Sequence, residues 1–128
     1  MAQILVIDDN PEFREILRAH LEANGHRVVL AENGEHGLTL LDSHTVDIVL
    51  TDILMPQRDG VEVLRETKRR WPMLPVIAIS GGGWIGAGEL LGMAERLGAD
   101  QVLQKPVRRD DLIRAVDEAL SANLQRRA

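Results

Sequence analysis

The sequence contains no cysteine, which excludes disulfide bonds, thiolate metal sites and cysteine nucleophiles. Aromatic residues are scarce, with one phenylalanine, two tryptophans and no tyrosine, so we expect no stacking platform for single-stranded nucleic acid. No apolar stretch approaches the roughly 20 residues of a membrane span, and the chain begins without the basic segment of a signal peptide. We therefore expect a cytoplasmic protein that does not enter a membrane.

Positive charge is also in short supply, with 15 lysines and arginines against 20 aspartates and glutamates and a formal net charge of -5. This balance gives no electrostatic reason for direct binding to nucleic acid or to an anionic membrane. We interpret the short basic clusters at 68–70, 108–109 and 126–127 as solvated helix faces or ends. With 128 residues, the chain has the size of one domain with its own hydrophobic core.

Short apolar runs alternate along the chain with segments of helical periodicity. Five such alternations predict right-handed crossovers and a parallel sheet with helices on both faces. We therefore expect a doubly wound, flavodoxin-like α/β fold with five strands in the order 2-1-3-4-5 and five helices. The predicted strands are residues 3–7, 27–31, 46–51, 75–80 and 101–104.

The predicted helices follow the strands in turn. Asn10 and Asp110 are predicted to cap the first and last of them, whereas Asn33-Gly34 is predicted to form a turn. We assign residues 1–122 to one domain and residues 123–128 to a C-terminal tail that frays. The apolar faces of the five helices include Leu17, Leu38, Leu64, Met93 and Val116.

Polar residues follow four of the five apolar runs. Asp8-Asp9 ends the first run, Asp52 the third and Ser80 the fourth, and Lys105 follows the fifth. Because the carboxyl ends of parallel strands share one edge of the sheet, we expect these side chains to lie near the switch point between the first and third strands. Clustered carboxylates repel one another unless a cation joins them, and hard oxygen ligands favour Mg²⁺.

Two further groups make this edge suitable for phosphate. Lys105, one of only two lysines in the chain, contributes a positive charge, and Ser80 contributes a hydroxyl donor. A divalent cation, an ammonium group and a hydroxyl around one carboxylate can bind a phosphoryl group, and the carboxylate can act as the nucleophile that accepts it. The pattern therefore predicts a phosphoryl-transfer site.

Simpler interpretations exist for each residue. Asp8-Asp9 could form a turn, Asp52 could cap a helix, and Ser80 could satisfy a loop backbone group. Their common position at one predicted edge favours the functional interpretation. The four histidines share no metal-ligand spacing, and we interpret them as structural or surface residues.

One glycine pattern suggests a different function. Gly81, Gly83 and Gly86 satisfy G-x-G-x-x-G after a predicted strand, with Asp100 downstream, as in a dinucleotide-binding fingerprint. A dinucleotide needs two mononucleotide-binding halves, and only one strand-helix-strand unit remains after this motif. We therefore rank this alternative below phosphoryl transfer.

Taken together, the motifs resemble the receiver domain of two-component response regulators, and in particular the stand-alone, chemotaxis-regulator-like kind. The resemblance extends over essentially the whole chain. It rests on Asp8-Asp9, the stretch Asp52–Gly60, Ser80 and Lys105-Pro106.

The resemblance implies a role for each matching residue. Asp52 would be the phosphoacceptor, with Asp9 as a direct Mg²⁺ ligand, Asp8 as an acid that holds the metal through water, and the Leu54 carbonyl as a main-chain ligand. Ser80 would swing toward the phosphoryl group. Such a protein is not an enzyme acting on other molecules, but a phosphoacceptor that promotes its own phosphorylation and dephosphorylation.

The resemblance also implies partners and a readout. Lys105 would bind the phosphoryl group next to a cis bond to Pro106. The donor would be the phosphohistidine of a histidine kinase or a histidine phosphotransfer protein. The added charge, roughly 1.5 to 2 units at pH 7, would switch the fourth helix, fifth strand and fifth helix for binding to a downstream target protein.

Two positions depart from the family pattern. Val102 replaces the usual Tyr or Phe, and the three glycines at 81–83 loosen the loop after Ser80. We hypothesise that this loop and Trp84 replace the aromatic switch, and that Gly82 leaves the acyl phosphate open to water. The missing aromatic also allows an alternative function, a receiver-like scaffold that binds partners without phosphorylation.

Overall fold

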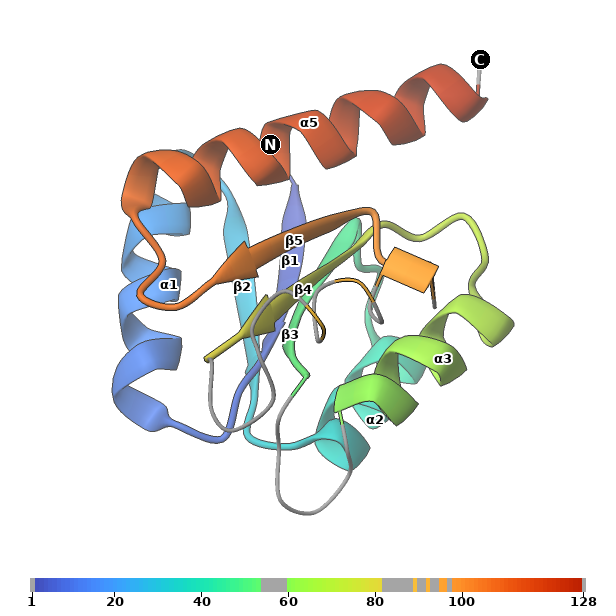
Figure 1. Cartoon of the computed structure of the whole chain (residues 1–128), viewed down its shortest axis with the longest axis horizontal. Coiled ribbons are helices and arrows are strands. Elements are labelled where there is room, and N and C mark those ends of the chain that lie inside the picture. The colour runs from blue at the N-terminus through green and yellow to red at the C-terminus, as the bar shows by residue number, and fades with distance from the viewer. Residues whose placement is uncertain are drawn as a thin grey trace.

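The structure, a computed structural model, describes residues 2–53, 60–81, 89, 92, 95–96 and 98–127, without the side chains of 125–127. Figure 1 shows a central sheet between helices. Its five strands are parallel and follow the predicted order, β2-β1-β3-β4-β5. The strands are β1 (Gln3–Ile7), β2 (Arg27–Ala31), β3 (Ile48–Asp52), β4 (Val76–Ser80) and β5 (Gln101–Gln104).

The described residues form four helices, one fewer than predicted. The segment predicted as a helix between β4 and β5 includes Met93, which lies outside the described residues. The described helices are α1 (Pro11–Ala23), α2 (Gly34–Ser43), α3 (Gly60–Arg70) and α5 (Arg109–Arg127).

The sheet is covered on both faces, with α1 and α5 on one side and α2 and α3 on the other (Figure 1). Alternate residues of β1 point to opposite faces of the sheet. Leu5 and Ile7 belong to the core cluster beneath α2 and α3, and Ile4 and Val6 belong to the core cluster beneath α1 and α5. This burial on both faces explains why the strands are continuous apolar runs rather than alternating patterns. Because both faces of the sheet are buried, polar functional groups are placed at the ends of the strands.

Asparagine side chains cap the N-termini of the first two helices. The predicted cap of α1 is confirmed, because the Phe13 amide donates to Asn10 Oδ1 at 3.1 Å. The predicted turn at Asn33-Gly34 is wrong: Asn33 Oδ1 accepts from the His36 amide at 2.8 Å and caps α2. Asparagine is favoured both in turns and at helix caps, so the residue pair alone does not separate the two.

Helix α5 differs from the prediction at both ends. It begins at Arg109, and the Leu112 amide bonds to the carbonyl of Arg108, so Asp110 lies in the first turn and is not the cap. A carboxylate in that turn still complements the positive helix end. The helix continues to Arg127 through residues assigned to a fraying tail, and Asn123 is buried. No helix formed by the described residues is long and apolar enough to cross a membrane.

Candidate functional site

The switch point of the sheet brings the acidic residues together. β1 and β3 are neighbours with Ile7 opposite Thr51, so Asp8 and Asp52 lie at the same edge. Carboxylate oxygens of Asp8, Asp9 and Asp52 all lie within 4.8 Å of one another. This is the arrangement that the strand ends predict.

The three carboxylates differ in burial. Asp8 is only 1% exposed and Asp52 4%, whereas Asp9 is exposed. Asp8 Oδ1 accepts from the Asn10 amide at 2.8 Å, and its buried Oδ2 lies 3.1 Å from the ammonium nitrogen of Lys105. The cluster therefore combines two buried carboxylates with one solvent-facing carboxylate, a donor set that suits a hard, partly hydrated cation such as Mg²⁺.

Lys105 contributes the positive charge of the site. Its Nζ donates to Asp52 Oδ2 at 3.0 Å and forms an ion pair with Asp8 Oδ2 at 3.1 Å. The backbone of Lys105 is fixed to β4, because its amide donates to the Ser80 carbonyl at 2.7 Å. The bond between Lys105 and Pro106 is cis, as the resemblance implies. The lysine therefore reaches across β4 and β3 to both buried carboxylates.

The protonation of Lys105 follows from its surroundings. Burial is the largest influence and by itself lowers the pKa, because it disfavours the charged form. Hydrogen bonding and attraction to Asp52, and then to Asp8, outweigh burial and raise the pKa of Lys105 above its ordinary value. The ammonium group is therefore charged at neutral pH.

The remaining predicted positions lie around this centre. Ser80 is the last residue of β4 and is fully buried. Asp52 pairs with Ile79, the residue before Ser80, so Ser80 and Asp52 lie at the same edge of the sheet. Val102 pairs with Ala78 and packs against the core beneath α2 and α3. The other predicted positions of this region lie outside the described residues: Leu54, Gly82, Gly83, Trp84 and Gly86.

Asp100, the acid of the dinucleotide alternative, lies at the opposite end of the strands. Its Oδ2 accepts from Lys68 Nζ at 2.8 Å and from the Val76 amide at 2.8 Å, just before β5 begins. Dinucleotides bind at the carboxyl ends of strands, so this contact counts against that alternative. It also corrects the interpretation of Lys68 as a solvated residue, because its side chain is only 16% exposed.

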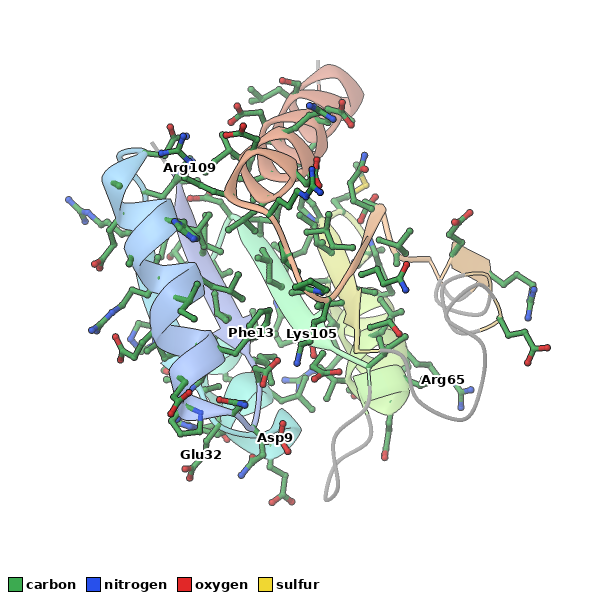
Figure 2. All side chains as sticks on the ribbon, turned by 60° about the vertical axis from the view of Figure 1, so that its left-hand side comes forward. Asp9, Phe13, Glu32, Arg65, Lys105 and Arg109 are labelled. Carbon is green, nitrogen blue, oxygen red and sulfur yellow. The ribbon has the colours of Figure 1, made fainter. Side chains whose placement is uncertain are left out.

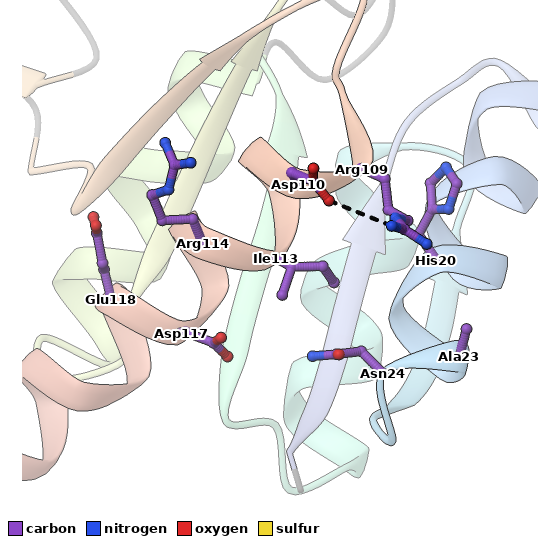
Figure 3. A pocket seen from close by; sticks show the side chains of 9 residues that line it. All are labelled: His20, Ala23, Asn24, Arg109, Asp110, Ile113, Arg114, Asp117 and Glu118. Carbon is purple, nitrogen blue, oxygen red and sulfur yellow. Dashed lines mark hydrogen bonds and ion pairs between the residues drawn. The ribbon is translucent and has the colours of Figure 1, made fainter.

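A prominent groove of the described surface lies away from the acidic cluster. It has a volume of about 490 Å³ and runs between α1 and α5, where His20 and Asn24 face Arg109 and Asp117 (Figure 3). Its lining mixes both charges. Within the described part of the chain, the three aspartates form the only group of acidic or histidine side chains placed to hold a metal.

Sequence reasoning did not identify one neighbour of the site. The Phe13 ring lies against Lys105, with its centroid 4.3 Å from Nζ (Figure 2). No sequence argument placed Phe13 at the site, and its position in the first turn of α1, beside Asp8-Asp9, is the only signal that could have placed it here.

An acidic cluster with a lysine, set at the switch point of a doubly wound parallel sheet, defines a class of α/β domains built to bind a cation and a phosphoryl group together. The sequence profile of the response regulator receiver domain matches residues 4–117. The chain therefore belongs to the response regulator receiver family of two-component systems.

Curated relatives agree with this assignment. The chain is 35% identical over 119 residues to the transcriptional regulatory protein GlrR of Escherichia coli, across 93% of this chain and 26% of that protein. It is 36% identical over 113 residues to the transcriptional regulatory protein CpxR of Klebsiella pneumoniae, across 88% and 47%. The chain thus spans between a quarter and a half of these relatives.

Solved structures resemble this fold over most of the chain. A response regulator receiver domain protein from Clostridium thermocellum is 32% identical, with a TM-score of 0.90 over 98% of both chains. The receiver domain of NtrX from Brucella abortus is 32% identical, with a TM-score of 0.86 over 92% of this chain and 98% of that chain.

Proposed function

We propose that this chain is a stand-alone response regulator receiver that accepts a phosphoryl group on Asp52. The donor is the phosphohistidine of a histidine kinase or a histidine phosphotransfer protein in the cytoplasm. The observation that supports this proposal is the contact of Asp52 Oδ2 with Lys105 Nζ at 3.0 Å, inside a cluster of three carboxylates. A buried acid beside a fixed ammonium is a poor solubilising group and a suitable phosphoacceptor.

The proposed step transfers a phosphoryl group between a nitrogen and an oxygen. An oxygen of Asp52 attacks phosphorus, the new O–P bond forms as the N–P bond breaks, and the imidazole of the donor leaves with the electron pair and takes a proton. Lys105 is placed to neutralise charge on the transferred group, and Ser80 is proposed as its hydroxyl donor. Hydrolysis of the aspartyl phosphate would return Asp52 to the free carboxylate.

We assign the cation site to Asp8, Asp9, Asp52 and the Leu54 carbonyl. The approach of the three carboxylates to within 4.8 Å of one another and the exposure of Asp9 support this assignment, and Leu54 rests on the family resemblance alone. A bound Mg²⁺ would shield the negative charge of the incoming phosphoryl group.

The readout proposed for the phosphorylated form involves β5, α5 and the segment between β4 and β5. Lys105 directly follows β5, so a phosphoryl group that pulls on this lysine also pulls on the edge strand. The free and phosphorylated forms would differ in affinity for a downstream target. Residues 1–122 are proposed as the switching unit, and the stand-alone state is tested by the mass of the protein isolated from its source.

Phosphorylation is tested by intact mass after incubation with acetyl phosphate and Mg²⁺. We expect a mass gain of one phosphoryl group, lost in Asp52→Asn and kept in a matched variant of an exposed acid, Asp42→Asn. A gain that survives in Asp52→Asn would contradict the assignment of the acceptor. A folded chain that is never modified, but captures the same targets, would support the scaffold alternative.

A further inference from the structure

Phe13 and Lys105 come from opposite parts of the chain and meet beside the phosphoacceptor. Phe13 lies in the first turn of α1, and Lys105 follows β5. The ammonium nitrogen sits 4.3 Å from the centroid of the ring, within the range of a cation–π contact (Figure 2). Phe13 is the only phenylalanine of the sequence.

The Phe13 ring covers a side of the Lys105 ammonium group that the two carboxylates do not contact. A lysine has three N–H donors: one is directed at Asp52 Oδ2, and Asp8 Oδ2 lies 3.1 Å away as an ion-pair partner. The ring covers a further side of the ammonium, and the lysine side chain is left only 24% exposed. Water that would otherwise compete for the ammonium is thereby kept away from part of it.

The ring packs against the core cluster beneath α1 and α5, and hydrogen bonds tie the backbone of Phe13 to the acidic loop. The Phe13 amide is bound to the Asn10 side chain, and Asn10 donates its own amide to Asp8. The next residue, Arg14, donates from Nη1 to the Asp8 carbonyl at 2.6 Å. The first turn of α1 is therefore hydrogen-bonded to the acidic loop, and the ring that this turn carries can orient the flexible lysine.

We propose that Phe13 is a positioning residue, whose ring face holds the Lys105 ammonium against Asp8 and Asp52 in the orientation that phosphoryl transfer uses. The residue acts through Lys105. This inference rests on the proposed function for its effect on rate, but the contact itself exists in the unmodified protein and can be measured there.

The test changes the electronics of the ring and preserves its shape. Because position 13 carries the only phenylalanine, biosynthetic incorporation of increasingly fluorinated phenylalanines alters this ring alone. Fluorine withdraws charge from the ring face and weakens cation–π attraction. We expect the phosphorylation rate with acetyl phosphate at saturating Mg²⁺ to fall stepwise, by roughly three- to tenfold overall, the range that a partly desolvated cation–π contact supports.

Three substitutions separate positioning from general stability. Phe13→Leu keeps apolar volume without a ring face and should match the most fluorinated protein, whereas Phe13→Tyr keeps the face and should retain the rate. Ile16→Ala lies one turn along the same helix, is 51% exposed in the parent, and should leave the rate unchanged. A rate that is insensitive to fluorination would overturn the proposal.

A second readout requires no phosphorylation. The chain has only two lysines, so the side-chain NMR signals of Lys105 can be read with Lys68 as internal reference. Phe13→Leu should remove a ring-current shift from Lys105 and make its side chain more mobile, with no change at Lys68. Unchanged Lys105 signals would overturn the proposal, whereas a parent that shows the contact but is never phosphorylated would overturn only the proposed function.

Discussion

Gly60, the first residue of α3, packs directly against the backbone of Asp52. A Cβ built on Gly60 would lie 2.8 Å from the Asp52 carbonyl carbon and closer still to its oxygen and to Ile53 Cα. Real Cβ atoms do not approach backbone atoms so closely, and backbone, unlike a flexible side chain, cannot turn away. The start of α3 and the position of Asp52 are therefore mechanically linked.

Substitution of this glycine should disturb both stability and phosphorylation. Gly60→Ala forces α3 and β3 apart, and we expect a loss of about 1–3 kcal/mol in the free energy of unfolding, the usual cost of overpacking. Urea denaturation measures this loss, and acetyl phosphate labelling measures the slower modification of Asp52. In the control Gly92→Ala, the new Cβ would meet, among the described residues, only Arg96 Nη1 at 3.6 Å, so an equal effect there would contradict the packing argument.

The site illustrates what sequence can and cannot predict. Asp8, Asp52 and Lys105 each stand where an apolar strand ends, which is a local signal, and strand alternation alone brings those ends to one edge. From sequence, Gly60 stood out only as the last residue of the stretch Asp52–Gly60, because the approach of its Cα to Asp52 depends on how α3 packs on the sheet. Phe13 was missed for the same reason.

The basic cluster at 68–70 shows a second limit. Composition predicted a solvated helix face, and this holds for Arg69, which pairs with Glu66 on the surface. Lys68 lies on the same helix, but the carboxylate with which it pairs, Asp100, lies 32 residues further along the chain. A contact between residues separated by 32 positions leaves no periodic trace in the sequence.

Lys68→Met should therefore lower the stability of the folded protein. The substitution removes an ammonium that donates to Asp100 Oδ2 at 2.8 Å and to the Leu74 carbonyl at 2.9 Å, both in a partly buried position. We expect a loss of about 1–3 kcal/mol in the free energy of unfolding, because a partly buried carboxylate loses the ammonium group with which it pairs. Arg69→Ala, which breaks an exposed pair on the same helix, is the control and should change the urea midpoint little. Equal midpoints for the two variants would show that burial of the Lys68 pair is unimportant.

Magnesium should stabilise the protein by binding the folded state. A ligand that binds only the folded form adds about 2.7 kcal/mol to the free energy of unfolding at roughly 100 times its Kd. The melting temperature should therefore rise with Mg²⁺ and not with NaCl of equal ionic strength.

Asp9→Asn should reduce this rise in melting temperature, because it removes the solvent-facing carboxylate of the cluster. Without Mg²⁺ the same variant should be equal to the parent or slightly more stable, since one repulsive charge is gone. Asp111→Asn, an exposed acid of α5, should respond to Mg²⁺ like the parent; a full response in Asp9→Asn would remove Asp9 from the metal site.

Acid should destabilise the protein through His26. Burial is the main cause that lowers the pKa of this imidazole below its ordinary value of 6.5. The Ala2 amide donates to His26 Nδ1 at 3.2 Å, and Nε2 has no hydrogen-bond partner among the described residues, so a proton on Nδ1 would face another donor. The folded state therefore binds a proton less readily than the unfolded state.

The sign of the pH effect follows from that difference. The stability associated with neutral His26 is fully present above pH 6.5, and it is lost as the pH falls below that value, because the unfolded chain takes up the proton first. When the pH is lowered through 6.5, the urea midpoint should therefore fall more for the parent than for His26→Gln. The amide oxygen of the substituted glutamine can still accept from the Ala2 amide. His36→Gln, at an exposed histidine of α2, should retain the parent's slope. Parallel pH profiles for the parent and His26→Gln would show that another group controls the loss of stability in acid.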